Sequence, residues 1–211
     1  MRSRFVTVVP VKPPTVGKSR LEVGDPERRR ALASAFALDT VAACLRAEEV
    51  GQVLVATDDA AFARDLHALG CHVVPDGDTN DLNAALRQAA AEAHRRWSHL
   101  VPVAVCADLP ALLPHDLDAA LSQVDATGPA FVADAEGSGT TVYLAPYARF
   151  EPRFGPGSAQ AHRAGGALEV SGELASLRHD VDDLAGLDLA RTLGLGPATQ
   201  LAIAGMGGLS G

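Results

Sequence analysis

Residues 101–110 read VPVAVCADLP, a short apolar run that ends in an acid and a proline. An apolar run without alternation is typical of a strand covered on both faces, as in a parallel sheet. Pro110 then turns the chain, so Asp108 is expected just beyond the carboxyl end of this strand. Ligands of open α/β sheets bind at that edge, so the stretch predicts both a fold class and the place of a site.

The segments on either side alternate between strand and helix patterns. Strands are predicted at residues 4–11, 52–57, 71–76, 101–108, 129–134 and 140–146, with a short edge strand at 174–179. Helices are predicted at 26–47, 58–69, 81–96, 114–124 and 184–193. Repeated strand–helix units indicate one α/β domain, with a mostly parallel sheet and helices on both faces. We expect this domain to span residues 1–203 and residues 204–211 to form a disordered tail.

Composition narrows the classes of function. The chain has 211 residues, is 47% hydrophobic and 21% charged, and carries a net charge of −8. The acidic balance argues against binding to nucleic acid, which needs basic patches. No apolar run reaches about 18 residues, so no membrane span is predicted, and a cytoplasmic chain is the simplest interpretation. The three cysteines lack metal-binding spacing and are expected to be buried thiols of a reduced compartment.

The first predicted strand leads into a basic loop, VPVKPPTVGKSRL at residues 9–21. Lys12, Lys18 and Arg20 surround Gly17, and three cations at a strand end suit a triphosphate. The spacing matches neither the P-loop nor the dinucleotide fingerprint. A solvated basic loop is the alternative interpretation.

Acids recur near the end of the chain, in RHDVDDLAGLDLA at residues 178–190. Asp180 and Asp182 are two apart on an extended segment, so they would share one face, and one of them could complete a metal site with Asp108. Mg²⁺ prefers one or two carboxylates together with phosphate oxygens. Asp183 is better explained as a helix N-cap. The alternative is that all these acids, Asp108 included, cap helices or are solvated.

Two glycine-rich segments suggest a second anion site. The first is EGSGTT (136–141), and the second is FGPGSAQAHRAGGA (154–167). Gly155, Gly157 and Ser158 could present N–H groups and a hydroxyl to an anion, and Ser158 could cap a helix from Ala159. A plain capped loop is the alternative. No nucleophile motif is present, which favours direct displacement on a phosphate.

Together, these motifs resemble the CofC/FbiD family of guanylyltransferases in coenzyme F-420 biosynthesis. The resemblance rests on KSRL, ATDD, NAAL, ADLPAL, GSGTT, FGPGSAQAHRAGGA and DVDDLAGL, which occur in the family's order over nearly the whole chain. It implies a single-domain Rossmann-like nucleotidyltransferase fold with a mostly parallel mixed sheet. The chain departs from the family's pattern at Asp81, where a glycine is common.

The resemblance also implies a reaction. GMP would pass from GTP to phosphoenolpyruvate in the presence of Mg²⁺, giving enolpyruvoyl-diphospho-guanosine and pyrophosphate. The alternative acceptor is 2-phospho-L-lactate, but the Ala- and Arg-rich composition resembles the actinobacterial members, which use phosphoenolpyruvate. A nucleotidyltransferase for a sugar phosphate or molybdopterin, or a non-catalytic GTP-binding module, is a more distant alternative. A homo-oligomer is compatible with the sequence.

By the same resemblance, each candidate residue receives a role. Asp108, with Asp180 or Asp182, would bind the metal, and Asp108 and Lys18 would serve catalysis. The acceptor would lie against Thr140, Gly155 and Ser158, and GTP against Lys12, Lys18, Arg20 and Asn83, with Asp58 or Asp59 near the ribose or base.

Overall fold

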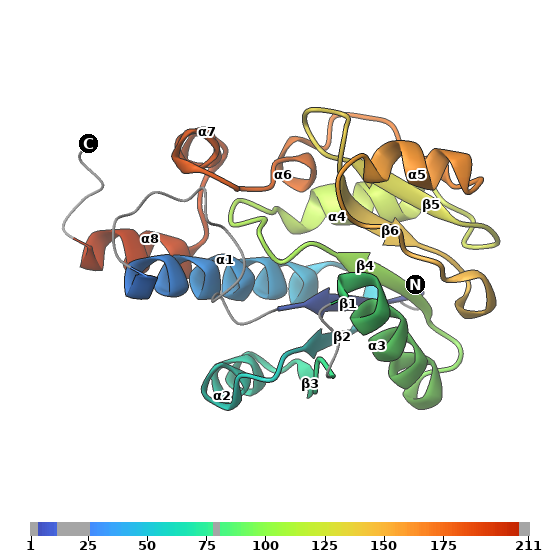
Figure 1. Cartoon of the computed structure of the whole chain (residues 1–211), viewed down its shortest axis with the longest axis horizontal. Helices are drawn as coiled ribbons and strands as arrows, with labels where there is room; N and C mark the ends of the chain where they lie inside the picture. The colour runs from blue at the N-terminus through green and yellow to red at the C-terminus, as the bar shows by residue number, and fades with distance from the viewer. Residues whose placement is uncertain (1–3, 12–25, 78–80, 207–211) are drawn as a thin grey trace.

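A computed structural model describes residues 4–11, 26–77 and 81–206 of the chain. Its strands are β1 (Phe5–Pro10), β2 (Val50–Ala56), β3 (His72–Val74), β4 (Val101–Val105), β5 (Ala130–Ala133), β6 (Thr140–Leu144) and β7 (Leu168–Glu169). Its helices are α1 (Pro26–Arg46), α2 (Ala60–Leu69), α3 (Leu82–Arg96), α4 (Pro114–Ser122), α5 (Ser158–Ala164), α6 (Ala175–Arg178), α7 (Leu184–Leu193) and α8 (Pro197–Gly205), with a 3₁₀ turn, η1, at Tyr147–Arg149. Figure 1 shows these elements around one central sheet.

The described strands form one sheet in the order β3-β2-β1-β4-β6-β5-β7. Strand β6 runs antiparallel to its neighbours β4 and β5, and the other pairings are parallel. This confirms the predicted mostly parallel mixed sheet. Because β6 is reversed, its first residue lies at the carboxyl end of β4, where the Cys106 N–H donates to the Thr141 carbonyl (2.9 Å). The topology therefore brings Thr140 to the edge of the sheet that Asp108 occupies.

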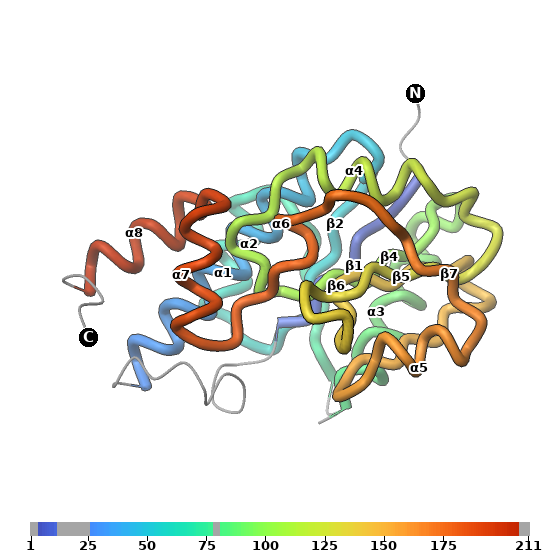
Figure 2. Tube along the Cα trace, turned by 90° about the horizontal axis from the view of Figure 1, so that it is seen from above, coloured from blue at the N-terminus to red at the C-terminus, as the bar shows by residue number. Residues whose placement is uncertain are grey.

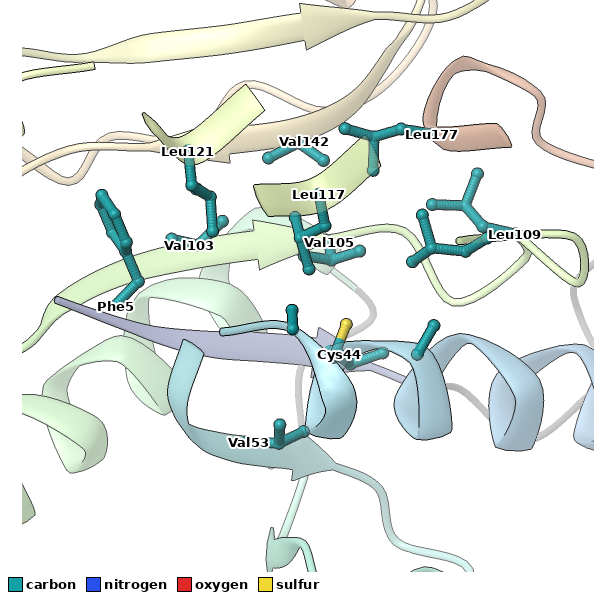
Figure 3. Packing of buried hydrophobic residues seen from close by; sticks show 14 of the residues in the cluster. Phe5, Cys44, Val53, Val103, Val105, Leu109, Leu117, Leu121, Val142 and Leu177 are labelled. Atoms are coloured by element: carbon teal, nitrogen blue, oxygen red, sulfur yellow. The ribbon is translucent and has the colours of Figure 1, made fainter. Parts of the chain in front are cut away.

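Alternation along the strands builds a core on each face of the sheet. Phe5 and Val9 of β1 pack with α1, α2, α4 and α6, whereas Val6 and Val8 pack with α3 and α5. Figure 3 shows part of the first core, where Val103 and Val105 of β4 lie among side chains from α1 and α4. Helices on both faces, as predicted, leave the strand ends available for a site.

The segment predicted as an edge strand at 174–179 is instead helix α6. Leu174 and Leu177 are both buried at helical spacing, and Asp116 accepts hydrogen bonds from the Ser176 N–H (3.0 Å) and hydroxyl (2.6 Å), which holds the turn. The edge strand is β7, which pairs with β5 and was not predicted because it is only two residues long.

A further helix, α8, follows the helix that was predicted to be the last. It begins with Pro197 at its first turn and includes the first two residues of the predicted tail, while 207–211 lie outside the described residues. Asp39 of α1 accepts from the N–H groups of Ala198 (3.0 Å) and Thr199 (2.8 Å), so a distant side chain caps it. Figure 2 shows α7 and α8 at one end of the molecule and α5 at the other. No described helix has the length and apolar character to cross a membrane.

Candidate active site

Three carboxylates meet at the edge of the sheet beyond β4. Asp108, Asp180 and Asp182 each offer an oxygen, and these oxygens lie within 4.8 Å of one another. Asp108 and Asp180 are half-buried and Asp182 is exposed. The structure thus brings together the three acids that the sequence placed in one site, although 72 residues separate the first two. Oxygen ligands at this spacing fit a hard divalent cation such as Mg²⁺.

The backbone explains how the acids meet. The Val181 N–H donates to the Asp108 carbonyl (3.0 Å), so the segment from 180 to 182 lies along the chain that leaves β4. Asp183 accepts from the Gly186 N–H (2.8 Å) and caps α7, as predicted. Asp108 is not the N-cap of the helix that follows it, because α4 begins six residues later with Leu113 at its N-cap position. The capping alternative therefore holds for Asp183 and fails for Asp108.

The electrostatics of the cluster call for a cation. Partial burial, together with the charges of Asp108, Asp182 and Asp134, raises the pKa of Asp180 to about 7. A carboxyl that resists ionisation beside two other acids is stabilised as an anion when a positive ion lies among them. The donor set and its charge therefore fit a divalent metal.

A tight turn places Thr140 beside this cluster. The Asp134 carboxylate accepts from the N–H groups of Ser138 (3.0 Å) and Gly139 (2.7 Å). A side chain at Gly139 would collide with that carboxylate, so glycine permits the close approach of Asp134 in its present position. Thr140 follows at the start of β6 and is buried.

The glycine-rich loop approaches the same turn. Gly155 (φ 135°) and Gly157 (φ 71°) have left-handed backbone conformations, which glycine adopts readily. Ser158 is the first residue of α5 and Gly157 occupies the N-cap position, so the expected capping role of Ser158 is wrong. The Ala159 N–H donates to the Ser138 carbonyl (3.2 Å), which joins this loop to the turn before Thr140. The three residues expected to bind the acceptor thus come from two segments that are tied together.

His162 and Arg163, to which the sequence assigned no role, differ in their exposure to solvent and in their contacts. Arg163 is paired with Glu169 (2.7 Å) on the surface and lies over the Phe131 ring. His162 is 1% exposed, with Nδ1 3.0 Å from Thr140 Oγ1 and Nε2 accepting from the Arg153 N–H (2.9 Å). Desolvation, aided by the charge of Arg153, lowers the pKa of His162 to about 4. The sequence did not predict the role of His162, because its position on α5 follows the same helical spacing as an ordinary core residue.

This pKa gives the protein an acid-sensitive stability. Because His162 takes up its proton at pH 6.5 when unfolded and at about pH 4 when folded, its contribution is full above pH 6.5 and is lost as the pH falls towards 4. The loss is at most about 3 kcal/mol. Urea unfolding of wild type and His162→Phe between pH 7 and pH 4 should therefore give a flatter profile for the variant. The exposed His99→Phe should keep the wild-type slope, and three equal slopes would contradict a neutral His162.

Asn83 has a structural contact that the sequence did not predict. Its side-chain N–H donates to the Phe154 carbonyl (2.9 Å), and its side-chain oxygen accepts from the Phe154 N–H (2.8 Å). Asp81 caps α3 by accepting from the Asn83 N–H (2.8 Å). The aspartate that replaces the family's usual glycine therefore stabilises the start of this helix. Asn83 therefore clamps the residue before Gly155 and stabilises the glycine-rich loop.

The other residues expected near GTP come from the segments that follow β1 and β2 in the sequence. Lys12, Lys18 and Arg20 lie outside the described residues. Asp59 caps α2, and Asp58 accepts from the Asp76 N–H (3.0 Å), so these strand-end acids hold the backbone near the end of β2.

Comparison with known proteins agrees with this geometry. Residues 5–165 match the model of the family described as "Guanylyl transferase CofC like". A phosphoenolpyruvate guanylyltransferase from Thermomonospora curvata is 46% identical over 201 residues, which cover 94% of this chain and 88% of that one. Another, from Salinispora arenicola, is 46% identical over 206 residues, covering 95% and 94%.

Solved structures share the fold at much lower identity. A protein from Desulfovibrio desulfuricans, named as a nucleotide-diphospho-sugar transferase, superposes with a TM-score of 0.71 at 18% identity and covers 97% of both chains. A 4-diphosphocytidyl-2C-methyl-D-erythritol synthase superposes with a TM-score of 0.59 at 15% identity, covering 91% of this chain and 99% of the other. These likenesses establish a nucleotidyltransferase fold. The family match over most of the described core, and relatives that align along nearly the whole length, establish that this chain belongs to the CofC-like family of guanylyl transferases.

Proposed function

We propose that this chain transfers GMP from GTP to phosphoenolpyruvate, giving enolpyruvoyl-diphospho-guanosine and pyrophosphate for the biosynthesis of coenzyme F-420. The observation that carries the proposal is the cluster of Asp108, Asp180 and Asp182. It lies at the strand edge where the Thr140 turn and the glycine-rich loop meet. The names of the relatives support phosphoenolpyruvate as the acceptor. Since GTP and phosphoenolpyruvate are cytoplasmic metabolites, we place the reaction in the cytoplasm.

The three aspartates would hold Mg²⁺. A protein from Mycobacterium tuberculosis with the same fold has been solved with manganese (TM-score 0.52, 19% identity), which supports a divalent ion in this fold but not its identity here. When bound, the ion would offset negative charge on the GTP phosphates and on the acceptor. The aspartates would fix its place, with Asp108 supplied by the segment that follows β4.

Basic side chains of the first loop would help to align GTP with the acceptor. Lys12, Lys18 and Arg20 would bind the GTP phosphates, with Lys18 beside the pyrophosphate that leaves. An oxygen of the acceptor phosphate forms a bond to the α-phosphorus while the bond to the bridging oxygen of pyrophosphate breaks. No general base is required, because a phosphate monoester is already largely a dianion at neutral pH. Alignment and charge neutralisation then account for catalysis.

The acceptor would rest against Thr140, Gly155 and Ser158. The exposed glycine backbone and the hydroxyls present hydrogen-bond donors to a phosphate and a carboxylate, which only accept. Asn83 would act on this loop through its two hydrogen bonds to Phe154.

Pyrophosphate release tests the proposal directly. We expect the purified protein to release pyrophosphate from GTP and Mg²⁺ when phosphoenolpyruvate is added, with the mass of enolpyruvoyl-diphospho-guanosine appearing in step. Reactions without acceptor, and with ATP in place of GTP, are the controls. Faster turnover with 2-phospho-L-lactate would reassign the acceptor, and the absence of turnover with either acid would overturn the proposal.

A further inference from the structure

His162 makes hydrogen bonds through both ring nitrogens, and these bonds determine where its proton lies. The Arg153 backbone N–H can only donate, so Nε2 must present a lone pair to it. The neutral ring then carries its hydrogen on Nδ1, which lies 3.0 Å from Thr140 Oγ1, and the Ser158 carbonyl is a second acceptor near this ring. The low pKa of about 4 keeps the ring neutral at physiological pH. His162 is therefore the donor in this contact and Thr140 is the acceptor.

The direction of this bond leaves the hydroxyl hydrogen of Thr140 available. A hydroxyl has one hydrogen and two lone pairs, and His162 uses a lone pair. Among the described residues, Thr140 Oγ1 has no other hydrogen-bond partner in the structure. Its hydrogen can thus be donated to an anion at the site. If the ring had the opposite tautomer, the same hydroxyl would give its hydrogen to Nδ1 and turn lone pairs towards the anion.

Aromatic rings hold His162 in this orientation. Tyr143 stacks on it with centroids 4.6 Å apart at 19°, and Phe131 and Phe154 lie at 5.6 Å. Rotating the ring by half a turn would replace both nitrogens with carbons against Thr140 and the Arg153 N–H. The packing and both hydrogen bonds therefore select a single ring orientation and a single tautomer.

We propose that His162 is a positioning residue that makes the Thr140 hydroxyl an obligate hydrogen-bond donor to the anionic acceptor. The inference rests on the proposed function, because it takes Thr140 as a contact of phosphoenolpyruvate. A donor is what a phosphate or carboxylate oxygen requires, since these oxygens only accept. Through the Arg153 N–H, the same ring also fixes the segment that leads into Gly155. One buried histidine thereby links the two segments that bind the acceptor.

A double-mutant cycle tests this coupling. Thr140→Val should raise the KM for phosphoenolpyruvate about tenfold in the wild-type background, a loss typical of one hydrogen bond to a charged group. In the His162→Phe background, Thr140→Val should raise the KM for phosphoenolpyruvate less than about twofold, because the Thr140 hydroxyl is no longer oriented. The KM for GTP should stay within about twofold in all variants. Equal effects of Thr140→Val in both backgrounds would overturn the inference.

The cycle separates this inference from the proposed function. Wild-type enzyme without turnover would remove the function, whereas normal wild-type turnover with independent effects would remove only the role of His162. A measurement that needs no turnover complements it, in case His162→Phe unfolds. Long-range ¹H–¹⁵N spectra of the wild-type protein, titrated from pH 8 to pH 5, should show the Nδ1–H tautomer of His162 throughout. An Nε2–H tautomer, or an imidazolium in this range, would overturn the inference.

Discussion

Asp108→Asn should abolish pyrophosphate release from GTP and phosphoenolpyruvate while leaving the protein folded. Asparagine keeps the size of the side chain but removes one of the charges that would hold the metal among Asp108, Asp180 and Asp182. Loss of several kcal/mol of charge stabilisation in the transition state corresponds to about a thousandfold in rate. Steady-state kinetics over a range of Mg²⁺ concentrations measure the loss, and saturating Mg²⁺ should not restore the rate.

Stability distinguishes this effect from unfolding. In the absence of metal, the charge of Asp108 raises the pKa of Asp180, so its removal relieves repulsion and should leave the melting temperature in chelator equal or higher. Asp183→Asn is the matched control, because Asp183 caps α7 outside the cluster and asparagine caps helices equally well. It should retain nearly full activity. Retained activity in Asp108→Asn would remove this residue from the metal site.

The architecture of this chain could be predicted because its strands and helices carry strong periodic patterns. The apolar run ending at Asp108 predicted a covered strand, and β4 is buried between β1, to which it is parallel, and β6, to which it is antiparallel. Where prediction failed, the deciding contacts came from distant residues. Helix α6 depends on Asp116 from α4, and α8 depends on Asp39 from α1. No window of sequence around either helix contains its cap.

The contacts of the candidate site also divide into those that a local sequence pattern predicts and those that depend on distant residues. Acids two residues apart at a strand end, as at Asp180 and Asp182, indicate a shared face, and the structure places them with Asp108. By contrast, the contact of His162 with Thr140 crosses 22 residues and depends on the reversed strand β6. The pairing of Asn83 with Phe154 crosses 71 residues. Neither pairing leaves a local pattern, so sequence reasoning assigned Asn83 to the nucleotide and left His162 without a role.

The clamp made by Asn83 leads to the second large effect. Asn83→Asp should weaken acceptor binding severely, because an aspartate oxygen would then face the Phe154 carbonyl where the amide N–H now donates at 2.9 Å. Two acceptors in contact, one of them charged and half-buried, cost about 2 to 3 kcal/mol. The segment that carries Gly155 and Ser158 would move away from this repulsion. We therefore expect a rise of about thirtyfold to a hundredfold in the KM for phosphoenolpyruvate.

The kinetic constants for the two substrates decide what Asn83 does. A clamp on the loop predicts a large rise in the KM for phosphoenolpyruvate and a small change in the KM for GTP. Direct recognition of the nucleotide, which the family resemblance implied for Asn83, predicts the reverse. Gln88→Glu is the matched control, since it makes the same amide-to-acid change at an exposed position on α3 and should leave both constants near wild type. If Asn83→Asp changes neither KM, the bonds to Phe154 do not hold the acceptor loop in its working conformation.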